Sequence, residues 1–106
     1  MPKYLALTKF TPEGLKGLHV SGAANRREAI RPMLESLGSS LEGYYFAFGE
    51  WDAYVIIDCP DDEAAAAASL AVNEAGAATA TIVKLLTPEQ VDVAFTRNAS
   101  YRRPGE

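Results

Sequence analysis

The pattern of apolar positions is most informative between residues 44 and 57, where nearly every position is hydrophobic. Aromatic and β-branched side chains favour extended structure on both sides of Gly49 and Asp52, which supply the chemistry of a tight turn. A strand that is apolar on both faces must be covered on both faces. A chain of 106 residues has too few helices to cover a sheet twice. The pattern therefore predicts a hairpin in a sheet that a partner subunit helps to cover.

The hairpin strands are expected at residues 41–48 and 53–59, with further strands at 3–10 and 77–86. Helical spacing appears between them. Four apolar residues recur at i, i+3, i+4 and i+7 and so share one helical face: Ile30, Met33, Leu34 and Leu37. A capping-box spacing at residues 25–28 opens this helix and Gly38 ends it, while Pro32 either bends it or marks a later start.

Two other helices are predicted further along the chain. Acidic residues at 61–63 open an alanine-rich helix that ends at Gly76. Thr87 opens a short helix that reaches about Phe95. By contrast, the glycine-punctuated segment 15–22 is expected to be a loop or one helical turn.

The resulting order is β-α-β-β-α-β, which predicts an α+β, ferredoxin-like fold with an antiparallel sheet and with the first and third strands in its centre. In each of these two strands, side chains alternate between the two faces of the sheet, and apolar residues occur on both faces. One set, expected to face the helices, contains Leu5, Leu7, Val55 and Ile57. The other set, expected to face away from them, contains Tyr4, Ala6, Thr8, Phe10, Tyr54 and Ile56. The second face would suit a subunit contact or the wall of a ligand pocket.

Several segments of the chain together resemble the GYD-domain family. They are residues 1–5, 11–18, 27–29, 35–38 and 48–52. The resemblance spans about residues 2–95, and Trp51 stands where the family's eponymous tyrosine is expected. It implies ferredoxin-like subunits that assemble into a dimeric α/β barrel, and it implies little about chemistry. We accordingly expect a GYD-type domain over residues 1–95 and a polar C-terminal tail over 96–106.

Composition indicates which kinds of partner and which cellular compartment to expect. The net charge of −4, with basic clusters only at residues 26–27 and 102–103, disfavours nucleic acid. Cys59 has no second cysteine to pair with, and no apolar run approaches the roughly 20 residues that span a bilayer. With no cleavable leader recognisable, we expect a cytoplasmic homo-oligomer, at least a dimer, that binds neither nucleic acid nor membrane.

Two titratable residues are candidates for proton transfer. His19 is the only histidine and lies in the glycine-rich segment, while Asp52 lies in the hairpin turn beside Trp51. Each also has a structural explanation: an exposed loop histidine, and an aspartate that bonds turn backbone. One histidine and one cysteine 40 positions apart form no metal-ligand spacing, so neither a metal nor a cofactor is expected.

Ligand contacts are expected mainly from aromatic residues. Tyr4, Tyr45, Trp51 and Tyr54 are candidates for the wall of a cavity. Arg26 and Arg27 begin a helix, where positive charge opposes the dipole, so Arg27 is a candidate anion contact, with a solvated helix face as the alternative.

Three functional hypotheses follow from these residues. The first is an uncharacterised GYD-type homodimer that binds a small organic ligand between or beside its sheets. The second is a small dimeric-barrel enzyme, of the cofactor-independent oxygenase or isomerase type, and it rests on fold analogy. The third is a purely structural interaction module. A pocket with titratable groups would favour the enzyme, and an apolar pocket without convergent acids would favour binding.

Overall fold

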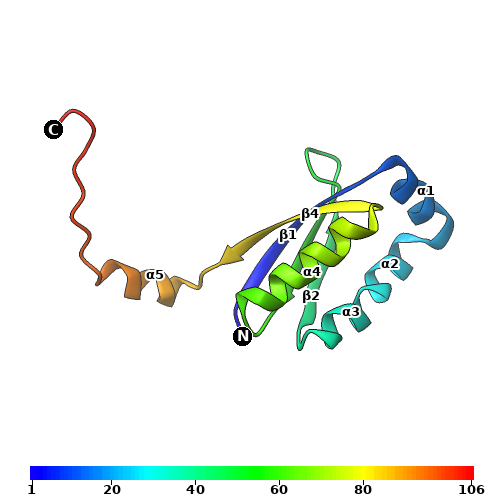
Figure 1. Cartoon of the computed structure of the whole chain (residues 1–106), viewed down its shortest axis with the longest axis horizontal. Coiled ribbons are helices and arrows are strands. Elements are labelled where there is room, and N and C mark those ends of the chain that lie inside the picture. Colours follow the sequence, from blue (N-terminus) through cyan, green and yellow to red (C-terminus); the bar gives the residue numbers. More distant parts are fainter.

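The apolar segments form a four-stranded antiparallel sheet in a computed structural model that describes all 106 residues. The strands are β1 (Lys3–Phe10), β2 (Ser40–Phe46), β3 (Ala53–Asp58) and β4 (Ala78–Leu85). Their order in the sheet is β2-β3-β1-β4, which places β1 and β3 in the centre (Figure 1). The α+β class, the antiparallel sheet and the two central strands predicted from the sequence are therefore confirmed.

Five helices accompany the sheet, and those that pack on it cover one face (Figure 1). They are α1 (Pro12–Ser21), α2 (Ala23–Ala29), α3 (Arg31–Ser36), α4 (Asp62–Ala75) and α5 (Pro88–Phe95). The core lies between that face and the helices α3 and α4. Leu34 of α3 and Cys59, which follows β3, are its largest fully buried side chains.

Helix α4 lies close on the sheet because its buried positions are alanines: Ala64, Ala65 and Ala68. The Asp61 carboxylate accepts a hydrogen bond from the Ala64 amide at 2.9 Å and caps the first turn. Gly76 ends the helix in the left-handed conformation, with φ of 78°. Both predicted boundaries of this helix are confirmed.

The segment 15–22, expected to be a loop or one helical turn, lies mostly within the ten-residue helix α1, so that prediction was wrong. The Thr11 hydroxyl accepts a hydrogen bond from the Gly14 amide at 3.1 Å, and the Thr11 amide donates to the Ala77 carbonyl at 3.0 Å. A Cβ on Gly14 would stand 1.8 Å from that same carbonyl oxygen. Capping and this close approach fix the start of α1 despite its glycines.

The helix predicted over residues 25–38 is divided into α2 and α3 at Ile30. Pro32 has no amide hydrogen to continue the α2 hydrogen-bond series, and it sits instead in the first turn of α3. Gly22, with φ of 95°, precedes α2 without a side-chain cap, so the expected capping box at residues 25–28 is absent.

The strand register corrects one prediction about the faces of the sheet. Tyr4, Ala6 and Thr8 pair with Ile57, Val55 and Ala53, so these side chains share the helix-covered face, and all six are buried. Leu5 and Leu7 pair with Ile56 and Tyr54 on the open face. The expectation was right for β3 and inverted for β1, where both alternation sets are apolar.

The hairpin connection, residues 47–52, is longer than the tight turn expected, and it is tied to the neighbouring strand β1. The Asp52 amide donates to the Thr8 carbonyl at 2.9 Å, and the Phe10 amide donates to Asp52 Oδ2 at 2.8 Å. Trp51 is more than half buried. Asp52 thus anchors the loop to β1 rather than bonding only its own turn.

Helix α5 and the C-terminal residues extend away from the body beyond the end of β4 (Figure 1). Every residue from Leu86 to Glu106 is exposed. The start of α5 is nonetheless well defined, because Thr87 and Gln90 form a capping box, as the sequence predicted. The exposed side chains include Val93 and Phe95, which are 55% and 79% accessible.

Candidate functional site

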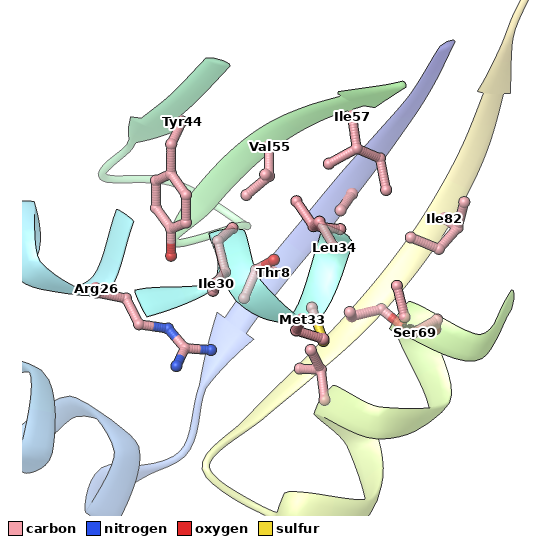
Figure 2. A pocket seen from close by; sticks show the side chains of 14 residues that line it. Thr8, Arg26, Ile30, Met33, Leu34, Tyr44, Val55, Ile57, Ser69 and Ile82 are labelled. Carbon is pink, nitrogen blue, oxygen red and sulfur yellow. Dashed lines mark hydrogen bonds between the residues drawn. The ribbon is translucent and has the colours of Figure 1, made fainter. Parts of the chain in front are cut away.

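A cavity lies between the sheet and the helices α2, α3 and α4 (Figure 2). The space in it that the centres of water molecules can occupy is about 50 Å³, and eleven of its fourteen lining residues are hydrophobic. By that measure one water needs about 10–15 Å³. The cavity therefore has room for several water molecules or for a compact organic group.

Small side chains on three elements leave this space open. Ala6 of β1, Ala68 of α4 and Ala80 of β4 all line the cavity. Larger side chains from α3 and β3, among them Met33 and Val55, close it from other directions (Figure 2). Because alanine fills so little of the gap between helix and sheet, the cavity follows directly from the sequence at these positions.

Arg26 of α2 brings a positive charge to this apolar cavity (Figure 2). Its Nε is buried and has no hydrogen-bond partner. The two neighbouring arginines differ: Arg27 and Arg31 each donate through Nε to the Glu28 carboxylate at 3.0 Å. Arg26 takes part in none of the ion pairs of the chain.

Tyr44 of β2 lines the cavity with its hydroxyl directed toward Arg26 (Figure 2). Burial raises the pKa of this phenol above its ordinary value, and the nearby Arg26 guanidinium opposes that rise without overcoming it. Tyr44 is therefore protonated at neutral pH, and its hydroxyl can donate a hydrogen bond.

A second, outer groove adjoins the cavity at Arg26, which lines both spaces. The groove has a volume of about 310 Å³ and runs between α1, α2 and the end of β1. Only four of its ten lining residues are hydrophobic, and Glu13 and Asn25 are among the polar ones. Arg26 thus stands at the boundary between an open polar groove and a mostly apolar interior.

The comparison with known protein families gives one match. The sequence model of the GYD domain matches residues 4–95. This chain belongs to the GYD domain family. No curated protein and no solved structure matches it significantly. The resemblance inferred from the sequence segments is confirmed, with nearly the same boundaries.

The GYD domain does not bring His19 and Asp52 together. His19 is exposed on α1 and lines a shallow depression there with Leu15 and Ala23. Asp52 accepts the hydrogen bond from the Phe10 amide in the hairpin loop. Neither residue lines the cavity. The structure gives no support to an acid–base pair, and a catalytic role for either residue stays a prediction.

The proposed aromatic contacts are dispersed over the domain. Tyr45 and Tyr54 face each other across β2 and β3 on the open side of the sheet, and Trp51 lies in the hairpin loop. Tyr4 is buried on the helix side, where its hydroxyl donates to Asp62 at 2.5 Å. Arg27 is exposed and paired with Glu28. None of these five residues lines the cavity.

The residues that sequence reasoning missed are Tyr44 and Arg26 as members of one cavity. A signal for Arg26 existed. Ile30 and Met33 follow it at i+4 and i+7, so continued helical spacing places Arg26 on the apolar face. Arg27 lies at the edge of that face, because Ile30 and Leu34 follow it at i+3 and i+7. The break between α2 and α3 does not abolish this relation, because Arg26, Ile30 and Met33 all line the cavity.

Clusters that would suggest metal chemistry are absent from the GYD domain. No group of three or more His, Cys, Asp or Glu side chains is arranged to hold a metal ion. None of the helices is both long and apolar enough to cross a bilayer.

Tyr4 should titrate far above a typical tyrosine. Its hydrogen bond to Asp62, followed by burial, raises the pKa of Tyr4 to about 12 from 10.0. Since the folded-state pKa exceeds the unfolded one, this stabilisation is complete below pH 10 and is lost as the pH rises through 12. Absorbance titration of the wild type and of Tyr4→Phe should differ by one ionisation near pH 12, with circular dichroism monitoring the fold. A difference centred near pH 10 would contradict the assignment.

Proposed function

We propose that this GYD domain binds a small organic molecule in the cavity between its helices and its sheet. The observation that carries the proposal is the buried, unpartnered Nε of Arg26 on a mostly apolar cavity. A buried donor without an acceptor costs about 1–3 kcal/mol. A ligand that supplies the acceptor would recover part of that cost, and ligand sites typically combine apolar walls with a few polar groups.

The cavity chemistry favours binding over the dimeric-barrel enzyme. Its lining contains no carboxylate, histidine or thiol that would act as a general base at neutral pH. The polar side chains that do line it are Thr8, Arg26, Tyr44 and Ser69, all of which can donate hydrogen bonds. Such a set orients a ligand and does not by itself abstract a proton.

We also propose that the domain works as a homodimer through the open face of its sheet. Across the strands, Leu5 lies between Ile56 and Val83, and Leu7 lies opposite Tyr54. Neighbouring apolar side chains on an uncovered sheet favour a sheet-to-sheet contact between two copies. Two such sheets facing one another would give the dimeric α/β barrel that the family resemblance implies.

Filling the cavity tests the ligand-binding proposal. Ala68→Leu places three more carbon atoms at the cavity wall, whereas Ala66→Leu makes the same change at an exposed position of the same helix. Saturation-transfer NMR with benzamide should show binding to the wild type and to Ala66→Leu, and at least about tenfold weaker binding to Ala68→Leu.

Thermal denaturation establishes that each variant is folded, and Ala80→Val at the facing strand is a second way to reduce the same space. Equal binding of benzamide by the wild type, Ala68→Leu and Ala80→Val would place the ligand elsewhere. No binding by the wild type, of benzamide or of benzoate, would remove the support for a binding function.

A further inference from the structure

We propose that the ligand of this cavity is a small organic anion, with its acid group bound by Arg26 at the boundary with the outer groove and its apolar body inside the cavity. This inference rests on the proposed binding function, and it adds the chemical class of the ligand and its orientation.

The first argument is charge. Arg26 is partly buried, and a positive charge partly withdrawn from water gains from pairing with an anion. Arg27 and Arg31 each form an ion pair with the Glu28 carboxylate. Arg26 has no acidic partner, although Glu13 lines the same outer groove. The domain therefore holds one uncompensated positive charge at the cavity, despite a net charge of −4.

The second argument is the set of donors around Arg26. Thr8 is only 7% accessible, and its hydroxyl makes no hydrogen bond within the protein, although it lies on the cavity wall (Figure 2). The Tyr44 hydroxyl is protonated at neutral pH and points toward Arg26 (Figure 2). The Ser69 hydroxyl, by contrast, already donates to the Ala80 carbonyl at 3.2 Å. Guanidinium and hydroxyl donors together match the oxygen atoms of a carboxylate.

The third argument is polarity on the two sides of Arg26. The cavity beyond it is lined by Ile30, Met33, Val55 and other apolar residues, and it is small. The groove in front of it is larger and more polar. An anion bound at the boundary would keep its charge beside the groove and place its hydrocarbon part in the interior. A compact monocarboxylate with an aromatic or branched body fits this arrangement best.

Benzoate and benzamide test the inference, because they share size and shape and differ in charge. The wild type should bind benzoate about 10- to 100-fold more tightly than benzamide by titration calorimetry or NMR, and added salt should reduce only benzoate binding. Arg26→Gln should lower benzoate affinity to that of benzamide. Arg26→Lys should retain part of the preference, because lysine keeps the charge without the planar fork.

Arg27→Gln is the matched control, since it removes the neighbouring charge outside the cavity and should keep the preference for benzoate. A loss of preference in Arg27→Gln equal to that in Arg26→Gln would overturn the assignment to Arg26. Equal wild-type affinity for both probes, with binding still blocked by Ala68→Leu, would overturn anion recognition and leave the binding function intact. Binding of neither probe would overturn both.

Discussion

Gly14→Ala is expected to destabilise the domain by about 3 kcal/mol, at the upper end of typical single substitutions. The new Cβ would stand 1.8 Å from the Ala77 carbonyl oxygen and 2.7 Å from its carbon. Both atoms belong to the backbone, so no flexible side chain can move aside. Relief requires α1 to separate from the α4–β4 connection, which would break the Thr11 amide to Ala77 carbonyl hydrogen bond of 3.0 Å.

Gly17→Ala is the control within the same helix. A Cβ there has no neighbouring atom within 4 Å, so alanine should stabilise the domain by about 0.5–1 kcal/mol through its higher helix propensity. Urea denaturation of the two variants should therefore move the midpoint in opposite directions. A Gly14→Ala variant as stable as the wild type would show that α1 does not pack on Ala77 in solution.

Leu5→Lys is expected to convert a dimer into a folded monomer. Leu5 lies at the centre of the open face, between Ile56 and Val83. In a dimer joined through this face, two lysines would be buried without acidic partners, at a cost of about 3 kcal/mol or more, which weakens association at least about 100-fold. In the free monomer the ammonium group reaches water, and the fold is retained.

Light scattering at micromolar concentration is the measurement. The wild type should have twice the chain mass of 11.4 kDa, and Leu5→Lys should have the chain mass itself. Ala66→Lys, on the helix-covered side of the molecule, should remain a dimer. The proposal fails if the wild type is a stable monomer, or if Leu5→Lys remains a dimer.

Sequence reasoning could predict those elements of the fold that are specified by residues close to them in the chain. The hairpin, the alanine helix and the cap at Thr87 each have residues nearby in the chain that specify them. It could not predict which side chains of β1 face the helices. Leu5 and Leu7 are more apolar than Tyr4 and Thr8, yet the latter pair is buried. Tyr4 can face the helices because Asp62, 58 residues away, accepts a hydrogen bond from its hydroxyl, and no periodicity reveals such a partner.

Helix α1 was missed for a related reason. Gly14 and Gly17 lower its intrinsic helix propensity, and the compensating contacts come from residues 76 and 77 at the far end of α4. At the candidate site, too, local sequence signals could be recognised and contacts between distant residues could not. An arginine on an apolar helical face can be seen in the sequence, but its presence in one cavity with Tyr44 depends on the tertiary arrangement of α2 and β2.

The exposed segment after β4 has a consequence for how this chain can vary. Residues 86–106 bury no side chain in the body, so the free energy of folding places little restriction on their identity. Substitutions at Val91, Val93 and Phe95 should therefore be nearly silent in the isolated chain. If selection nevertheless maintains apolar residues at these positions, it must act through molecules outside the chain. A survey of natural variation along α5 would then report on the partners of this domain rather than on its stability.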